Sequence, residues 1–239
     1  MTNDNKTNAL ILGLSILLGL SSLGYLLGAS AIKFKEYERT VTVKGLSERE
    51  YTADIVIWPI QFTVAENNLE LLYGIMEQNI KKIMEFMESK GIDRGEISFT
   101  APSITDKSAQ PYGDQGKAEF RYTASQTVTV YSSDIATIRR VMSELSALGK
   151  QGIVFTGDAY QTQTEYLFTR LNEVKPEMIE EATRKAREVA EKFAADSKSQ
   201  LGKIRKASQG QFTINDRDRN NPHIKKVRVV STVEYYLSD

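Results

Sequence analysis

The longest apolar segment of the chain covers residues 9–32, which contain no Asp, Glu, Lys or Arg. A helix rises about 1.5 Å per residue, so a helix of this length can cross a hydrocarbon core of about 30 Å. The residues that follow are polar, mixed and rich in strand-like alternation. The pattern therefore predicts a short tail over residues 1–8, a transmembrane helix over 9–32, a charged tether over 33–39 and a water-soluble domain over 40–239.

Two features of this segment leave its processing and its orientation open. Ala29-Ser30-Ala31 fits the cleavage site of a secretory signal, but the apolar run is long for a signal, so we favour an uncleaved single-pass anchor over a cleaved secreted form. The basic residues nearest the segment are Lys6 before it and Lys33, Lys35 and Arg39 after it. Under the positive-inside rule, this small bias taken alone favours a cytoplasmic position for the domain.

Within the same segment, Gly24 and Gly28 form a G-x-x-x-G step. Small residues at this spacing let two membrane helices approach closely, which makes both glycines candidates for membrane-helix packing. Glycine is also frequent in membrane helices in general, so ordinary usage is the competing interpretation.

Alternating apolar and polar residues predict several strands after the tether. A first strand begins at Thr40 and is expected to break at Gly45, and a second, over residues 53–65, contains Pro59, which should sit at an edge or a bulge. The polar residues between these strands are interpreted as an exposed, salt-bridged turn and as the best candidates for an inter-subunit contact: Glu48, Arg49 and Glu50. Further extended segments are expected over 96–104, 120–130, 153–168, 204–214 and 225–237, with a loop over 105–118.

Three stretches have helical periodicity. The first covers residues 69–87, after a capping pair of Asn67 and Glu70, and Gly91 ends it. The second runs from a Ser133 cap to Gly149, and the third opens near Pro176 and runs to about Ser199. The apolar stripe of the third helix is Met178, Ala182, Ala186, Val189, Ala190 and Phe193. Together these elements predict an α+β fold: a transmembrane helix, then long antiparallel or mixed strands and three helices.

Composition narrows the possible chemistry. The 239 residues contain 31 basic and 31 acidic side chains, so no net charge favours nucleic acid as a partner. There is no Cys, which excludes disulfides and thiolate nucleophiles, and the single His leaves little material for a zinc site or a Ser-His-Asp arrangement. We therefore expect no metal, no cofactor and no catalysis.

Several short motifs, in order, carry a resemblance to a known family. Residues 43–50, the pair Ala53-Asp54 and the pair Trp58-Pro59 resemble the entry of the membrane-anchored branch of the SIMPL-domain family. Residues 168–210 are similar to the long-helix region of that family, and residues 227–230 resemble its closing strand. The likeness covers roughly residues 40–238.

The resemblance implies an α+β domain outside the cytoplasmic membrane, often periplasmic, with a tendency to form rings or channel-like oligomers. It implies a loose association with envelope or oxidative stress, no agreed activity and no catalytic residues to transfer. It disagrees with the charge count on the side of the membrane. The chain departs from the family at Ala53, because many members have Pro before the Asp that opens the second strand.

One polar segment near the C-terminus resembles a ligand site. The alternating oxygens of Asp216, Asp218 and Asn220 suggest a calcium loop, but Asn221 stands at its Gly position and Val227 at its Glu position. We favour a solvated, self-paired hairpin tip. His223 follows in the same loop and could sense pH, although a lone loop histidine usually has no such role.

The leading hypothesis is an uncleaved protein of the inner (cytoplasmic) membrane, held in the bilayer by residues 9–32, with its C-terminal domain in the periplasm. It would be a non-catalytic, homo-oligomeric structural or interaction module of the cell envelope, possessing no nucleic-acid partner. The alternative is an envelope domain that senses or binds a small molecule or peptide in a cleft, which would require a large, partly polar pocket. A hydrolase would require two carboxyl groups that converge in a cleft.

Overall fold

The computed structural model describes residues 3–36, 39–109, 119–156 and 163–238. It begins with one long helix, α1 (Asn3–Glu36). Within α1, Leu10–Ile32 is long and apolar enough to cross a membrane, and none of it is buried against the rest of the described chain. A secretory signal would pass the same test of length and composition. The predicted tether is helical as far as Glu36, while residues 37 and 38 lie outside the described residues.

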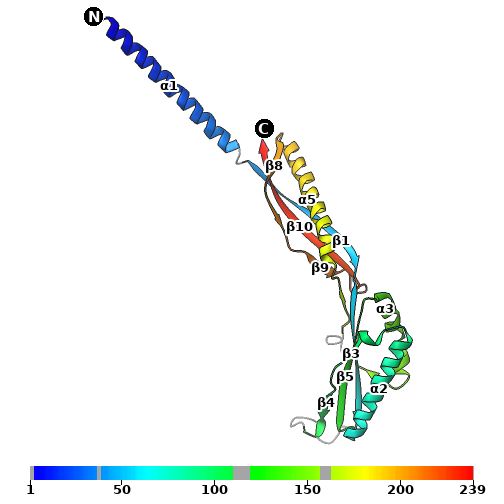
Figure 1. Cartoon of the computed structure of the whole chain (residues 1–239). Helices are drawn as coiled ribbons and strands as arrows, with labels where there is room; N and C mark the ends of the chain where they lie inside the picture. The colour runs from blue at the N-terminus through cyan, green and yellow to red at the C-terminus, as the bar shows by residue number, and fades with distance from the viewer. Residues whose placement is uncertain (1–2, 37–38, 110–118, 157–162, 239) are drawn as a thin grey trace. The chain divides into compact units, whose positions relative to one another are not determined.

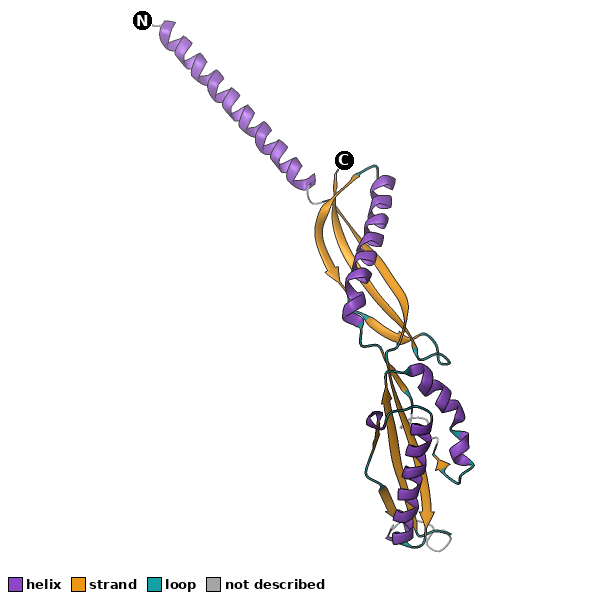
Figure 2. Ribbon diagram, turned by 45° about the vertical axis from the view of Figure 1, so that its right-hand side comes forward, coloured by secondary structure: helices purple, strands orange, loops and turns teal. Residues whose placement is uncertain are grey.

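The chain divides into two compact units. Unit 1 contains Met1–Glu48, Lys175–Thr213 and Arg228–Asp239, and unit 2 contains Arg49–Val174 and Ile214–Val227. The strands β1 (Thr40–Thr52), β9 (Thr213–Asp216) and β10 (Ile224–Ser238) contribute residues to both units. Figure 1 follows these elements along the chain, and Figure 2 separates helices from strands by colour.

In unit 1, one long helix covers a sheet. The sheet has the order β1-β10-β8, with β9 also paired to β10, and β8 (Gln200–Gln209) runs antiparallel to β10. The helix α5 (Leu171–Asp196) buries a row of small residues with one larger member: Met178, Ala182, Ala186, Ala190 and Ala194. Two apolar residues of the predicted stripe are instead exposed, Val189 at 38% and Phe193 at 54%, because they flank this row.

In unit 1, the backbone of α5 lies close to Gly45 of β1. A Cβ atom at Gly45 would lie 2.5 Å from the backbone nitrogen of Ala186 and nearer still to the carbonyl oxygen of Ala182. Gly45 therefore does not break β1, which continues through it to Thr52. It is the position at which the strand lacks a side chain so that the helix backbone can pack directly against it.

Unit 2 contains a second sheet, of order β3-β5-β2-β6, in which β4 pairs with β5 and β7 pairs with β2. Its central strands are β2 (Ile55–Glu66) and β5 (Tyr122–Ser132), which run antiparallel. The short strands are β3 (Ile97–Phe99), β4 (Ser103–Asp106), β6 (Val154–Phe155) and β7 (Glu165–Leu167). The helices are α2 (Leu69–Ser89), α3 (Ile135–Glu144) and α4 (Ser146–Gly149), together with short 3₁₀ turns at Arg94–Glu96 and Lys107–Ala109.

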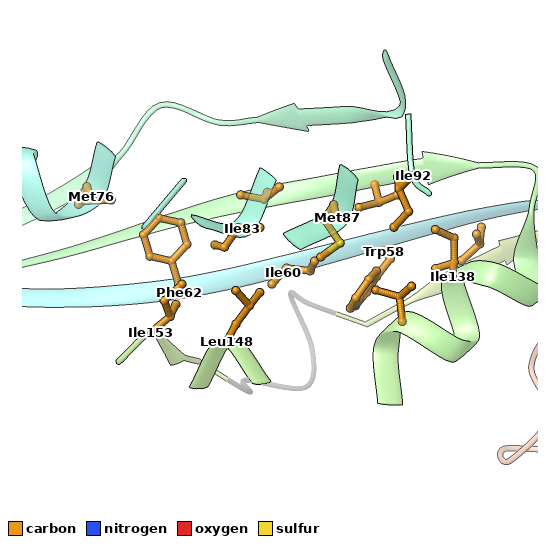
Figure 3. Close-up of a cluster of buried hydrophobic side chains, with 14 of the residues drawn as sticks. Trp58, Ile60, Phe62, Met76, Ile83, Met87, Ile92, Ile138, Leu148 and Ile153 are labelled. Carbon is orange, nitrogen blue, oxygen red and sulfur yellow. The ribbon is translucent and has the colours of Figure 1, made fainter. Parts of the chain in front are cut away.

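The predicted apolar face of residues 53–65 forms the core of unit 2. Trp58, Ile60 and Phe62 are buried together with Met76, Ile83 and Met87 of α2, Ile138 of α3 and Leu148 of α4 (Figure 3). Trp58 is 6% exposed and belongs to this core. Pro59 lies in a central strand and not at an edge or a bulge. It falls between the stretch of β2 that pairs with β7 and the stretch that pairs with β6, so its missing N–H leaves no hydrogen bond of those two pairings unmade.

Several predicted boundaries are wrong by a few residues, and for α2 and α3 the reason is that another side chain provides the cap. Asn68, not Asn67, caps α2 by accepting from the backbone nitrogens of Glu70 and Leu71, whereas Asn67 binds backbone groups of Glu119 and Arg121. Asp134, not Ser133, caps α3 through the nitrogen of Thr137. The helix α5 begins at Leu171, before Pro176, and the expected strands over 96–104 and 204–214 are each divided in two. Residues 110–118 and 157–162 lie outside the described residues.

Substitution of Gly45 by Ala should destabilise unit 1. The added methyl group meets backbone atoms of α5 that cannot rotate away, and overpacking of this kind typically costs about 1–3 kcal/mol. Hydrogen exchange measured by mass spectrometry on the detergent-solubilised full-length chain should show faster exchange of α5 amides in Gly45→Ala. The matched control is Gly74→Ala in α2, where a Cβ would meet no atom within 4 Å and α5 should exchange as in the parent. Unchanged α5 exchange in Gly45→Ala would contradict the close packing.

Candidate functional site

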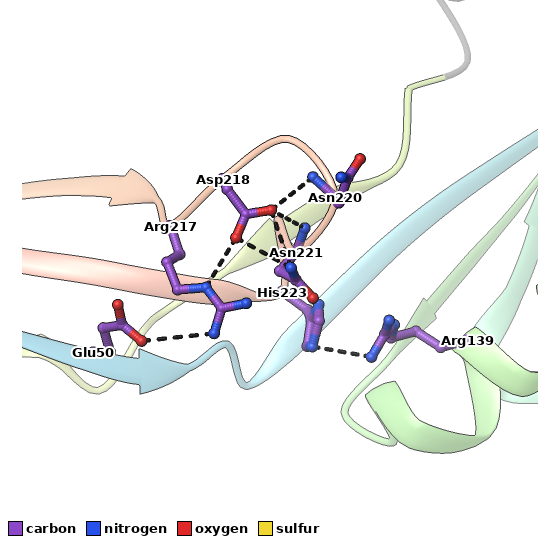
Figure 4. A network of polar contacts seen from close by, with 7 residues as sticks. All are labelled: Glu50, Arg139, Arg217, Asp218, Asn220, Asn221 and His223. Atoms are coloured by element: carbon purple, nitrogen blue, oxygen red, sulfur yellow. Dashed lines mark hydrogen bonds and ion pairs between the residues drawn. The ribbon is translucent and has the colours of Figure 1, made fainter.

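A network of polar contacts in unit 2 surrounds the turn between β9 and β10. Asp218 accepts from Arg217 Nε at 2.9 Å, from the backbone nitrogens of Asn220 and Asn221 at 2.9 Å, and from the Asn221 side-chain amide at 3.0 Å (Figure 4). Asp side chains stabilise turns in this manner by accepting from backbone groups a few residues ahead. Because the bond from Arg217 stabilises the carboxylate, the pKa of Asp218 is lowered. The predicted self-paired hairpin tip is confirmed by these contacts.

The same contacts account for the oxygens that resembled a calcium loop. Asp216 pairs with Lys225, whose side chain is buried, and Asp218 is paired with Arg217. Within the described residues, no group of three or more His, Cys, Asp and Glu side chains could hold a metal ion. The carboxylates of the turn therefore serve its own structure.

The three candidate residues for inter-subunit contact lie in β1 and not in a turn. Since Gly45 does not interrupt β1, the strand runs through Glu48, Arg49 and Glu50. Glu50 Oε2 lies 3.7 Å from Arg217 Nη1, which connects β1 to the turn after β9 within unit 2. Glu48 also has an interaction of its own. The turn is thus corrected to a strand, and contact with another subunit stays a prediction.

His223 closes the turn and contacts α3. Its Nε2 atom lies 2.9 Å from Arg139 Nη1, and its ring meets Tyr166 edge-on with centroids 6.0 Å apart. A guanidinium group can only donate, so Nε2 must accept and the ring is neutral, with its proton on Nδ1. Nδ1 is buried and has no hydrogen-bond partner among the described residues. Burial, followed by the charges of Arg139 and Arg217, lowers the pKa of His223.

Ala53, where many members of the family have Pro, makes a backbone hydrogen bond in the segment that joins β1 to β2. The Ala53 nitrogen donates to the His223 carbonyl oxygen at 2.8 Å, a bond that Pro at this position could not make. Asp54 accepts from the backbone nitrogen of Thr169 at 2.7 Å and from its hydroxyl at 2.5 Å. Burial opposes ionisation of Asp54, but the bonds from Thr169 and the charge of Arg170 outweigh it and lower the pKa.

The described acidic groups with a displaced pKa all have it lowered by hydrogen bonds or nearby basic groups, with burial the opposing influence: Asp54, Asp106, Asp134, Glu144 and Asp218. A general acid that works near neutral pH needs the opposite shift. Asp54 and Asp218 are each held by a basic neighbour. The arrangement carries basic groups, a neutral imidazole and fixed carboxylates, which can bind and orient a ligand.

Sequence reasoning placed His223 and Asp218 in one loop but missed Arg139, Asp54 and Tyr166. Arg139 lies on the exposed face of α3 with no local motif, and 84 positions separate it from His223. Only the tertiary fold brings the two together. A Cβ at either anchor glycine, Gly24 or Gly28, would meet no described atom within 4 Å beyond its chain neighbours and the adjacent backbone of α1.

An apolar N-terminal helix followed by two sheets with helices packed on them defines an α+β protein of the membrane-anchor or signal-sequence type. Residues 41–233 match the model of the SIMPL family, described as "Protein of unknown function (DUF541)". The chain therefore belongs to the SIMPL family. A comparison with the curated proteins finds no match for the chain.

Unit 2 should lose stability as the pH falls below about 6.5. His223 has a lower pKa in the folded chain than the 6.5 of the free side chain, so the unfolded chain binds the proton more readily. The contribution is complete above pH 6.5 and is lost as the pH falls through the folded pKa. Urea unfolding followed by Trp58, the sole tryptophan, should give a midpoint that falls between pH 7.5 and 5.5.

The control for this titration is His223→Gln, which keeps an acceptor for Arg139 but does not titrate. Its urea midpoint should vary less between pH 7.5 and 5.5 than that of the parent chain. An equal slope in both proteins would show that His223 is not the group responsible.

Proposed function

We propose that the chain is a single-pass protein of the inner membrane whose folded part lies in the periplasm. There it acts as a non-catalytic, homo-oligomeric structural or interaction module of the cell envelope. The observation that carries the proposal is the sheet of unit 1, in which β1 and β8 each pair on one side only within the described residues. An unpaired strand edge presents free N–H and C=O groups to another chain.

The two open edges differ in charge, and this difference favours one mode of pairing. β8 carries Lys203, Arg205 and Lys206 and no acidic residue, and all but its second and third residues are exposed. Two β8 edges would bring like charges together, which is unfavourable. Residues 40–48 of β1 carry one basic and one acidic side chain, Lys44 and Glu48, so the β1 edge avoids that repulsion.

Pairing of β1 with β8 of the next copy uses two different surfaces of each chain. Such heterologous contacts repeat from copy to copy and close into a ring where the rotation allows it. Copies anchored by the same helix share one orientation relative to the membrane, which suits a ring. The exposed pair Val189 and Phe193 adds apolar surface on α5, and Gly24 and Gly28 leave α1 free to approach another helix.

Removal of one outward-facing N–H donor from β8 should reduce assembly. Gly210 donates to Val230 of β10, and in an antiparallel ladder successive residues point in opposite directions, so the N–H of Ala207 faces away from β10. Ala207→Pro removes that outward donor and should convert the detergent-solubilised protein from a multiple of 26.9 kDa toward the monomer. Mass photometry or light scattering at micromolar concentration provides the measurement.

The control for the edge is Ala207→Val, which adds a side chain of similar bulk and keeps the N–H. It should assemble like the parent chain. A parent chain that is monomeric at micromolar concentration would remove the oligomer from the proposal, and equal masses for the Pro and Val variants would remove β8 from the interface.

The side of the membrane has its own test. The family likeness favours the periplasm, whereas Lys33, Lys35 and Arg39 favour the cytoplasm. Added protease should digest the domain in cells with a permeabilised outer membrane and an intact inner membrane. Protection until the inner membrane is disrupted would place the domain in the cytoplasm and overturn this part of the proposal.

A further inference from the structure

The positive charges around His223 are not balanced equally. Arg217 has two acidic partners, Asp218 at 2.9 Å and Glu50 at 3.7 Å. Arg139, by contrast, has His223 as its hydrogen-bond partner, and no carboxylate of the described chain lies within 4.0 Å of it. Its next neighbour on α3, Arg140, lies in the field of Asp134 and Glu144. Within the part of the chain that the structure describes, Arg139 is therefore an exposed guanidinium group beside a neutral imidazole, with no acidic partner.

The groups that face His223 come from three directions. Arg139 approaches from α3, Tyr166 from β7, and Arg217 with Asp218 from the turn that contains the histidine. From the segment before β2, the Ala53 N–H donates to the backbone carbonyl oxygen of His223. Asp218 is already occupied by Arg217 and by the turn. The acidic group that would stabilise a charged imidazole here has thus to come from outside the described chain.

We propose that Arg139 and His223 form a site for an oxyanion, a carboxylate or a phosphate group, whose binding is accompanied by protonation of His223. In the empty state Arg139 donates directly to Nε2. In the bound state Nε2 gains one proton from solvent, and both Nε2–H and the guanidinium N–H groups donate to oxygens of the anion. A guanidinium group has five donors and matches such planar groups with two parallel hydrogen bonds.

The proposal follows from a linkage between the anion and the proton. Without an anion, a proton on Nε2 places two positive groups 2.9 Å apart, each with only donors toward the other. An anion between them replaces this repulsion by two attractions. Anion binding must therefore strengthen as the pH falls, and the anion must equally strengthen proton binding. The site lies in unit 2 and does not depend on assembly through the unit 1 sheet.

The chain is well suited to a direct test, because His223 is the single histidine. Labelling full-length, detergent-solubilised protein with ¹³C-histidine gives one imidazole signal, whose pKa can be followed by NMR in chloride, acetate or inorganic phosphate at equal ionic strength. The pKa should be below 6.5 in chloride and should rise by about one unit in acetate, phosphate or both. A rise in acetate alone identifies a carboxylate site, and a rise in phosphate alone identifies a phosphate site.

The variants separate this site from a general salt effect. Arg139→Gln should raise the pKa in chloride and remove its dependence on the anion. Arg140→Gln removes the same charge one position along α3 and should leave the dependence intact. Trp58 fluorescence checks that each variant is folded. An equal pKa of His223 in all three salts would overturn the proposal, as would an anion dependence that persists in Arg139→Gln.

Discussion

The arrangement of unit 1 depends on the contact between α5 and Gly45. At this position the helix backbone lies so close to β1 that no side chain fits, and the facing residues of α5 are alanines for the same reason. Small residues on both surfaces allow a close approach but bury little area each, so the contact must extend along the whole helix. It does so from Met178 to Ala194, which covers one face of the sheet with a single element.

A sheet covered by one helix retains its two edges. In unit 1 these edges are β1 and β8, and they differ in charge: like-charge repulsion disfavours pairing of two β8 edges but not pairing of β8 with β1. Unit 2 is built differently, with a large apolar core under α2, α3 and α4 and short flanking strands on its sheet. The proposed division of labour follows from this contrast: unit 1 provides surfaces for assembly, and unit 2 provides a stable body with a charged turn.

Local sequence patterns predict the elements whose residues lie close together along the chain. The apolar face of β2, the stripe of α2 and the membrane-length helix were all visible in the sequence, because each is a local pattern of adjacent turns or alternating residues. The prediction that Gly45 breaks the strand is wrong. In sequence, a glycine that lets a helix backbone pack against a strand cannot be told from a glycine that ends the strand. Val189 and Phe193 were assigned to a buried stripe whose true centre is the alanine row. The contact of Arg139 with His223 had no local signal, because it depends on how α3 and the β9–β10 turn pack.

The most direct test of assembly uses the lack of cysteine in the chain. Cysteines introduced as Thr42→Cys in β1 and Ser208→Cys in β8 can be joined by a short bismaleimide in native membranes. The doubly substituted chain should give a ladder of covalent multiples, and a mixture of the two single variants should give only dimers that contain one of each. A ladder that fails to form, or dimers that form within either single variant alone, would contradict pairing of the two different edges.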